Sequence, residues 1–277
     1  MERMPQLCSK ADVHSYFQIM ERIGKGSYGS VYKAKVLPLA RMELPEFHSQ
    51  TSASTSVAVK EIESVTREIE IMKLISGPNV LRCYGCFTDD LKRTHIVMEL
   101  CEGITLFERT LNWITHKTRF SRDDKQRILK EVAIGISTLH DMDIAHRDIA
   151  PSNIMLCGDN VKIIDYGFSI ITTNQRHLAE AAEWDVVGTF PDPQMPILEL
   201  SKYQDIWAWG QLAVHTYSGK ILLTRKGRGA EYQPLGDGLD MYQLKPAIVE
   251  LIKNLTDPDK PISQRPSLQN IIDTMAA

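Results

Sequence analysis

The 277-residue chain has few of the features that mark secreted, membrane-spanning or nucleic-acid-binding proteins. It contains no run of about 18 apolar residues, the length that a helix needs to cross a bilayer. Its first residues, Met1–Pro5, lack the apolar core of a secretory signal. Five cysteines, an odd number, argue against a disulfide framework and indicate a reducing compartment. The net charge of -3 gives no reason to expect nucleic acid or an anionic membrane as a partner. We therefore expect an intracellular globular protein, cytoplasmic or nuclear.

Cys83 and Cys86 form a C-x-x-C pair, which is the first half of many zinc sites. No second pair of cysteines or histidines in the sequence completes such a set. The surrounding residues 80–87 have the composition of a strand, so we interpret both cysteines as thiols that pack in a core.

A glycine motif, Gly24-x-Gly26-x-x-Gly29, is a candidate phosphate-binding loop. Alone it is a weak signal, because the same motif opens dinucleotide-binding folds, in which a helix follows the last glycine. Here residues 30–36 alternate and are rich in β-branched and aromatic side chains, which predicts a second strand. The pattern favours a hairpin whose glycines let backbone amides approach phosphate oxygens, with Val31 packing on a base.

Two segments of the first part are expected to lie outside the compact fold. Residues 1–16 are predicted to be a loosely packed leader. Residues 37–56 contain two prolines and a serine- and threonine-rich end, and are predicted to be an exposed loop of unusual length. We interpret this loop as a tolerated insertion, with the binding of a partner as the alternative.

Lys60 ends a predicted buried strand, 57–60, where its ammonium would either reach solvent or face a cleft. Eight residues later, Glu68 lies in a segment with apolar residues at helical spacing, predicted to end at 76–78. Glu68 is either the partner of Lys60 or an exposed surface residue. Glu70, on a different face of the helix, is the competing partner.

Residues 146–153, His-Arg-Asp-Ile-Ala-Pro-Ser-Asn, bring together four polar groups of different chemistry. The carboxylate of Asp148 can take a proton from a hydroxyl, and the carboxamide oxygen of Asn153 can bind a hard divalent cation. A strand-like run, 161–164, then leads into Asp165, which offers a second oxygen ligand.

These motifs, in this order and spacing, resemble those of protein kinases. Asp-x-Trp-x-x-Gly at 205–210 and Arg265-Pro266 extend the resemblance to about residues 17–273. It implies an α+β, bilobal protein-kinase-like fold with a small β-rich N-lobe and a larger, mainly helical C-lobe. The expected parts are a leader (1–16), the N-lobe (17–101, with the insertion 37–56) and the C-lobe (102–277).

The resemblance implies an ATP- and Mg²⁺-dependent enzyme that transfers the γ-phosphoryl group to serine or threonine hydroxyls of protein substrates. Asp148 would act as the base, while Asn153 and Asp165 would hold Mg²⁺. Lys60, paired with Glu68, would hold the nucleotide phosphates. No nucleic acid or membrane partner is expected, and the oligomeric state is open, a monomer being compatible.

The strand 94–99 and the following connector resemble the hinge that binds adenine, with Met98 at the gatekeeper position. The alternative is an edge strand followed by a turn. The full set of nucleotide-binding residues that the resemblance implies is Gly24, Gly26, Gly29, Val31, Ala58, Lys60, Met98, Glu99, Cys101 and Met155.

Ala150 is the main departure from the pattern, because serine/threonine kinases carry a lysine there. Loss of one cationic contact to the γ-phosphate would cost about 3–4 kcal/mol, by analogy with other charge-stabilising donors. Tyrosine kinases also carry alanine there but usually supply an arginine two positions later, where this chain has Ser152. The alternative function is therefore a pseudokinase or weakly active nucleotide-binding scaffold.

Further departures lie between residues 165 and 265. Tyr166 replaces the phenylalanine of Asp-Phe-Gly, and its hydroxyl needs a partner. Gln194 stands where a glutamate would pair with Arg265, which would deprive that guanidinium of its counter-charge. Asp185 is predicted either to pair with Arg147 in place of a phosphorylated residue or to be a solvated loop aspartate. Gly188-Thr189 leans towards serine/threonine specificity.

Overall fold

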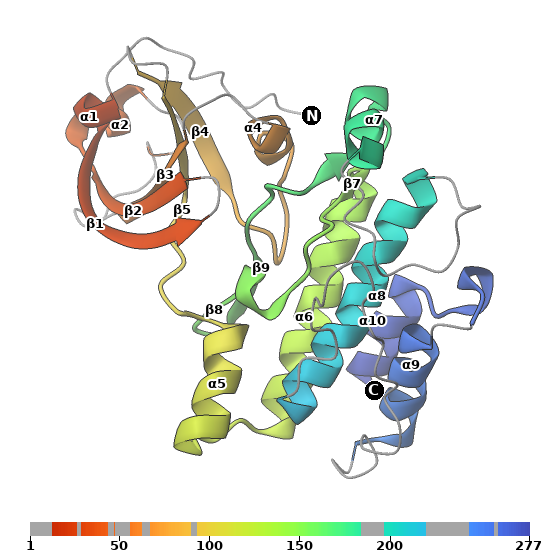
Figure 1. Ribbon diagram of the computed structural model, residues 1–277. Helices are drawn as coiled ribbons and strands as arrows, with labels where there is room; N and C mark the ends of the chain where they lie inside the picture. The colour runs from red at the N-terminus through yellow and green to blue at the C-terminus, as the bar shows by residue number, and fades with distance from the viewer. Residues whose placement is uncertain are drawn as a thin grey trace. The chain divides into compact units, whose positions relative to one another are not determined.

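The computed structural model describes residues 13–26, 29–43, 47, 56–62, 67–89, 93–183, 197–219, 244–257 and 260–277. The chain divides into two compact units. The first comprises Met1–Ser76 and Leu81–Glu102, and the second comprises Gly77–Val80 and Gly103–Ala277. The first is built on a β-sheet and the second is mainly helical (Figure 1), which confirms the predicted fold class. Within these ranges, no helix combines the length and apolarity needed to cross a membrane.

The first unit holds a five-stranded antiparallel sheet in the order β1-β2-β3-β5-β4. Its strands are β1 (Phe17–Gly26), β2 (Gly29–Val36), β3 (Ser56–Ile62), β4 (Cys83–Thr88) and β5 (Thr94–Glu99). Strand β2 follows β1 across the glycine motif, with Gly26 paired to Gly29. This confirms the predicted hairpin and excludes a dinucleotide-binding fold, which needs a helix there. Strand β5 lies between β3 and β4, so the alternative of an edge strand at 94–99 is wrong.

Cys83 and Cys86 are both buried on β4. The Sγ atom of Cys83 lies 3.7 Å from the carbonyl oxygens of Gly85 and Val97. Both thiols therefore belong to the core of the sheet, as predicted.

The leader and the long loop pack more closely than the sequence predicted. The short helices α1 (Val13–Tyr16) and α2 (Pro38–Glu43) contact each other, and the Tyr16 hydroxyl donates to Glu43 Oε2 at 2.7 Å. Val13, Ala40 and Phe47 are at most 1% exposed and belong to one core cluster with the sheet. The expectations of a loosely packed 1–16 and an exposed 37–56 are therefore wrong at these positions. Burying these apolar side chains against the sheet outweighs the loop-like local sequence.

The second unit begins with short strands and helices. Its strands are β6 (Ile104–Thr105), β7 (Ile144–Ala145), β8 (Ile154–Cys157), β9 (Asn160–Ile163) and β10 (Ile170–Ile171). Its α-helices are α5 (Leu106–His116), α6 (Arg122–Asp141), α7 (Gln175–Glu183), α8 (Ile197–Ser218), α9 (Pro246–Thr256) and α10 (Leu268–Ala276). The 3₁₀ helices are η1 (Pro151–Asn153) and η3 (Ile262–Gln264).

Helix α6 forms the centre of this unit and packs against α8 and α10 (Figure 1). The sequence over 121–139 predicts a helix that Ser121 caps and whose apolar residues form a core-facing stripe, namely Ile128, Leu129, Val132, Ile136 and Leu139. As predicted, the Ser121 hydroxyl accepts from the backbone N–H of Asp124 at 3.1 Å. The predicted apolar stripe is fully buried, with Leu129 and Val132 at 0% exposure. Trp209 of α8 donates its indole N–H to the carbonyl of Leu129 at 2.9 Å. These contacts fix α8, which carries Asp205 to residues 146–153, the segment that the resemblance makes the catalytic loop and that keeps this name below.

Candidate active site

The register of the first unit's sheet places several predicted nucleotide-binding residues on one face. Val31 pairs with Lys60, and Ala58 pairs with Met98. Residues directly opposite in an antiparallel pair, and residues two apart on one strand, point to the same side. These four side chains therefore share a face. The opposite face carries Val57 and the rest of the core cluster.

The glycine hairpin approaches β3 closely at its second strand. Gly29 has φ of 151°, and a Cβ atom there would lie 2.0 Å from the carbonyl oxygen of Glu61. Glycine is therefore required at this position by sterics alone. Gly24 lies on β1, opposite Val31.

Lys60 and Glu68 form a buried ion pair in the first unit. The Nζ atom of Lys60 lies 2.6 Å from Oε1 of Glu68, and the two side chains are 9% and 4% exposed. Glu68 belongs to α4 (Arg67–Met72), which ends at Met72, earlier than the sequence predicted. The alternative of an exposed Glu68 is thereby excluded. Such a pair fixes the position of the ammonium, because each charge is costly to leave alone at this burial.

The connector after β5 is anchored at both ends. Arg82 and Glu99 exchange bonds, with Glu99 N–H donating to the Arg82 carbonyl at 2.9 Å. Lys33 of β2 contacts Glu102 at 2.8 Å, and this hydrogen bond lowers the pKa of the Glu102 carboxyl. Cys101 lies between these anchors and is partly exposed.

In the second unit, Asp205 of α8 holds the loop that carries the predicted base. Its two carboxylate oxygens accept the backbone N–H groups of His146 at 2.8 Å and Arg147 at 2.7 Å. His140 Nε2 lies 2.9 Å from Oδ2 of the same carboxylate. Arg147 adopts a left-handed backbone with φ of 65°, which is uncommon outside glycine. The buried carboxylate therefore maintains a loop conformation that the local sequence does not favour.

Asp148, Asn153 and Asp165 are linked through hydrogen bonds within this unit. The carboxamide nitrogen of Asn153 donates to Oδ2 of Asp148 at 2.8 Å and to its carbonyl oxygen at 2.9 Å. The Asn153 carbonyl accepts from Ile164 N–H at 2.9 Å, and Ile154 pairs with Ile163 on β9. Asp165 follows at once, with a left-handed φ of 64°. Asn153 thus bonds directly to Asp148 and, through the backbone of Ile164, lies next to Asp165, which is 17 positions after Asp148 in the chain.

The hydroxyl of Tyr166 has a hydrogen-bond acceptor three residues earlier in the chain. The hydroxyl donates to the Ile163 carbonyl at 2.9 Å, and the side chain is 0% exposed. Its ring also packs edge-on against His146, with ring centroids 5.3 Å apart. The substitution for phenylalanine is therefore accommodated by one internal hydrogen bond.

The segment after Tyr166 is bound to the catalytic loop by contacts that the sequence did not predict. Strand β10 pairs with β7, and the Ser169 hydroxyl donates to the His146 carbonyl at 3.1 Å. Thr172 donates through both its N–H and its hydroxyl to the carbonyl of Asp143. Short two-residue strands give no usable periodicity in a sequence, which is why these contacts were missed.

Ala150 and Met155 flank η1 in the same unit. Ala150 is its N-cap residue, and its carbonyl accepts from Asn153 N–H at 2.9 Å. Met155 lies on β8 and pairs with Thr105 and Lys162. Asp185, Gly188-Thr189 and Gln194 lie outside the described residues, so the pairing of Asp185 with Arg147 stays a prediction.

The contacts of Arg265 include neutral groups and aromatic rings. Its guanidinium donates to the Tyr203 hydroxyl at 2.6 Å and to the carbonyls of Lys260 and Leu255. It also lies over the rings of Tyr203 and Trp207, at 5.3 and 4.8 Å. Burial raises the pKa of the Tyr203 hydroxyl, which keeps that group neutral. The sequence did not predict these contacts, and the expected loss of a counter-charge at Gln194, which lies outside the described residues, stays a prediction.

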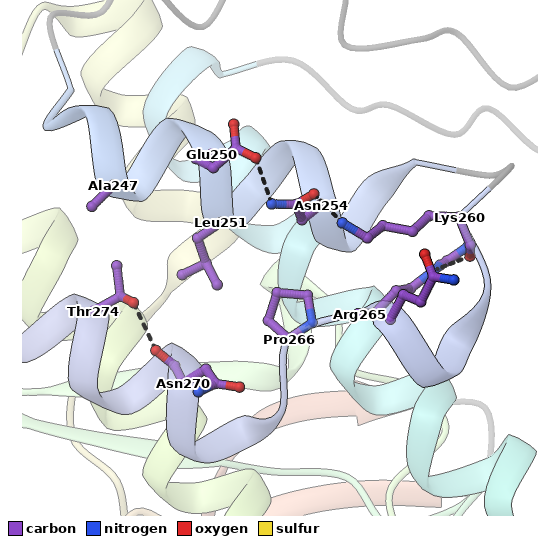
Figure 2. A pocket seen from close by; sticks show the side chains of 10 residues that line it. Ala247, Glu250, Leu251, Asn254, Lys260, Arg265, Pro266, Asn270 and Thr274 are labelled. Atoms are coloured by element: carbon purple, nitrogen blue, oxygen red, sulfur yellow. Dashed lines mark hydrogen bonds between the residues drawn. The ribbon is translucent and has the colours of Figure 1, made fainter.

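Arg265 and Pro266 also line an open hollow of about 420 Å³ between α9 and α10 (Figure 2). Its other polar residues bond mainly to one another, as with Asn254 and Glu250 at 2.7 Å. None of the residues predicted to bind nucleotide or metal lines it.

The oxygen donors of Asn153 and Asp165 suit a hard cation that keeps other ligands. The part of the chain that the structure describes contains no group of three or more His, Cys, Asp or Glu able to hold a metal. Mg²⁺ takes one or two protein ligands and completes its coordination with water and phosphate oxygens, so two oxygen donors are enough to hold it. Backbone and carboxamide contacts orient both candidate ligands.

Comparison with known sequences extends these observations over the whole fold. A family profile described as the protein kinase domain matches residues 17–275. Calcium-dependent protein kinase 5 of Plasmodium berghei is 28% identical over 217 residues. Calcium-dependent protein kinase 29 of Arabidopsis thaliana is 26% identical over 275 residues, and Aurora/IPL1-related protein kinase 2 of Caenorhabditis briggsae is 27% identical over 263 residues.

The coverage of these relatives differs. The match to the Plasmodium protein covers 74% of this chain and 35% of that relative. The match to the Arabidopsis protein covers 94% of this chain and 49% of that relative. The match to the Aurora-related protein covers 93% of this chain and 82% of that relative. The chain thus spans between a third and a half of the calcium-dependent relatives, and the calcium dependence in their names is said of those proteins.

Proposed function

Because the chain belongs to the protein kinase family, we propose that it is an ATP- and Mg²⁺-dependent enzyme that phosphorylates serine or threonine hydroxyls of proteins. The observation that carries the proposal is the arrangement of Asp148, Asn153 and Asp165. One asparagine bonds to the carboxylate of the first and, through Ile164, to the backbone beside the third.

Asp148 is the proposed base. Its Oδ2 accepts from Asn153, which leaves Oδ1 to receive the proton of a substrate hydroxyl as that hydroxyl attacks the γ-phosphorus. The backbone of the loop is fixed by Asp205, so the carboxylate does not need to be ordered when the substrate binds.

Asn153 and Asp165 are the proposed metal ligands. Both hydrogens of the Asn153 carboxamide can be accounted for by its two bonds to Asp148, so its Oδ1 is directed away from that residue. When bound, Mg²⁺ would neutralise charge on the nucleotide phosphates. In phosphoryl transfer this electrostatic support and the in-line positioning of reactants supply most of the catalysis.

Lys60 is proposed to hold the nucleotide phosphates, with Glu68 fixing its position. Val31, Ala58 and Met98 share the sheet face of Lys60 and are proposed to contact the adenine ring. The proposed nucleotide-binding residues also include the glycine hairpin and the backbone groups of Glu99 and Cys101. Met155, in the second unit, is a further proposed member.

A second candidate, a weakly active nucleotide-binding scaffold, is favoured by one observation. Ala150, where the resemblance calls for a lysine, occupies the N-cap position of η1, and its methyl side chain offers no charge to a phosphate. Ser152, two positions later, has a hydroxyl 3.5 Å from Asn153 Oδ1 and is also uncharged. The transferred phosphoryl group would then lack one cationic contact.

A radiolabelled ATP assay with a mixed set of serine, threonine and tyrosine peptides tests the proposal. Asp148→Asn is the matched control, because an amide oxygen can still accept from Asn153. We expect wild type to label serine or threonine peptides at least about 100-fold faster than this variant. Equal labelling by both would overturn the enzyme proposal. Ala150→Lys should raise the rate if the missing cation limits transfer.

A further inference from the structure

Helix α8 carries two charged side chains, one turn apart, that contact the same short stretch of chain. Asp205 accepts the first two backbone N–H groups of the catalytic loop. Three residues earlier, the ammonium of Lys202 donates to the carbonyl of His140 at 2.8 Å and to Oδ1 of Asp143 at 2.9 Å. Residues three apart are neighbours on a helix surface. The stretch 140–147, which joins the end of α6 to the catalytic loop, is therefore held by a cation at its start and by an anion at its end.

Both groups that Lys202 contacts belong to one turn with an uncommon backbone. Asp143 has a left-handed φ of 56°, which residues other than glycine adopt rarely and at a cost. Its N–H donates to the His140 carbonyl at 3.1 Å, and the same oxygen accepts from the Lys202 ammonium. The carboxylate of Asp143 bonds to that ammonium as well. Lys202 thus connects the carbonyl that opens the turn to the side chain of the residue that closes it.

The turn presents a carbonyl to the segment that follows Tyr166. The Asp143 carbonyl accepts both the N–H of Thr172, at 2.7 Å, and its hydroxyl, at 2.9 Å. Between these two residues, β7 pairs with β10. Because a carbonyl moves with its backbone, a change of Asp143 to a right-handed conformation would redirect this oxygen away from Thr172. The conformation of the turn therefore sets two of the contacts that hold this segment beside the catalytic loop.

Burial distinguishes the role of Lys202 from that of Asp205. Asp205 is 0% exposed, whereas the side chains of Lys202 and Asp143 are 29 and 53% exposed. Exposed ion pairs contribute little to the free energy of unfolding. An ordinary surface pair joins two side chains only, but here the ammonium also bonds to a backbone carbonyl within a left-handed turn. The contribution of Lys202 should therefore appear in the local conformation of the turn and not in global stability.

We propose that Lys202 is a positioning residue for the proposed phosphoryl transfer. It keeps the turn at Asp143 in its left-handed form, which holds Thr172 and orients β7, the strand that leads directly into the catalytic loop. The ammonium bonds to the turn, so its effect on Asp148 passes through the backbone. The effect on the rate rests on the proposed function. The effect on the turn does not, and it can be measured without nucleotide.

The test uses variants that separate the charge of Lys202 from the conformation of the turn. Lys202→Met keeps the length of the side chain and removes both bonds, whereas Lys202→Arg keeps a cation. Lys202→Met/Asp143→Gly is the decisive variant, because glycine adopts a left-handed φ without steric cost and no longer needs the ammonium. Lys130→Met is the matched control. Lys130 is half-buried on α6 in the same unit, and within the described ranges its side chain has no hydrogen bond or ion pair.

Hydrogen exchange reports the turn directly, because the Thr172 N–H is bonded to the Asp143 carbonyl. It is read by mass spectrometry on short peptides that contain Thr172, in protein without nucleotide. We expect this amide to exchange about fivefold faster in Lys202→Met, the change in population that loss of one exposed ion pair can produce. The rate should return towards wild type in Lys202→Arg and in the double variant, and should be unchanged in Lys130→Met.

The activity readout is kcat and the KM for ATP, measured with the peptides that are labelled in the assay above. We expect kcat to fall about fivefold in Lys202→Met while the KM for ATP is unchanged, because the turn does not belong to the proposed nucleotide set. Lys202→Arg and the double variant should recover most of this loss. The urea midpoint of Lys202→Met should match that of Lys130→Met.

Four results would overturn the proposal. Unchanged exchange at Thr172 in Lys202→Met would show that the ammonium does not hold the turn. Faster exchange with an unchanged kcat would reduce Lys202 to a structural contact. A loss of kcat that the double variant does not relieve would show that Lys202 acts other than through the turn. If wild type labels no peptide, the proposed function fails and the positioning role fails with it, whereas in the other three results wild type remains active.

Discussion

Substitution of Asp205 by alanine tests whether one buried carboxylate maintains the catalytic loop. Asp205 is 0% exposed and accepts three hydrogen bonds, from the backbone N–H groups of His146 and Arg147 and from the ring of His140. Alanine removes all of these acceptors at once. Its methyl group also leaves a space where the carboxylate was, and no other acceptor fills it.

The magnitude follows from the groups left behind. A buried N–H without a partner costs about 1–3 kcal/mol, and here two are orphaned along with the His140 ring. We therefore expect Asp205→Ala to lower the free energy of unfolding by about 3–5 kcal/mol. Asp205→Asn keeps one carbonyl oxygen and should lose about half as much. Relaxation of Arg147 from its left-handed backbone should also displace Asp148 and lower kcat at least about tenfold.

Tryptophan fluorescence in urea is suited to this measurement. All four tryptophans lie within 103–277, so the signal reports the second unit. Asp141→Ala, at an exposed position near the end of α6, is the control and should stay within about 0.5 kcal/mol of wild type. If Asp205→Ala matched this control in both unfolding and kcat, the carboxylate would not be what holds the loop.

Three further predictions follow from single side chains. Burial lowers the pKa of Lys125 to about 8, below its unfolded value, so the unfolded chain binds more protons above that pH. Stability should therefore rise from pH 8 to 10 in wild type, and denaturant titrations of Lys125→Met should lose this rise. Tyr166→Phe leaves the Ile163 carbonyl without its 2.9 Å donor and should cost about 1 kcal/mol in the same titrations, a neutral result contradicting the role given to that bond. Gly29→Ala would press a methyl group onto the Glu61 carbonyl, so the KM for ATP should rise several-fold, and an unchanged KM would refute this steric argument.

Features with a local signal were predictable from the sequence. The β1–β2 hairpin followed from alternation on both sides of the glycine motif, and α6 from its cap and its apolar stripe. The resemblance to protein kinases implied that Lys60 pairs with Glu68, but only the structure shows that a helix as short as α4 brings them to 2.6 Å. Local patterns thus specified elements and candidate residues.

Contacts between distant parts of the chain were not predictable. Phe47 lies in a stretch with a loop-like composition, yet it packs 5.8 Å from Phe17 because the sheet offers an apolar face there. Likewise, the acceptors around Arg265 come from α8, α9 and the preceding turn. Nothing in the sequence around the arginine indicates which distant groups its guanidinium will contact. Such choices depend on the assembled core.

The burial of Thr172 bears on how this chain could itself be modified. Its hydroxyl is 1% exposed and donates to the Asp143 carbonyl at 2.9 Å, whereas Thr173 beside it is exposed. An enzyme that adds a group to Thr172 must wait for the β7–β10 pairing to open, so its rate would scale with the small population of the opened form. Thr173 needs no such opening. The two neighbouring threonines therefore differ kinetically, and modification on a short timescale would select Thr173.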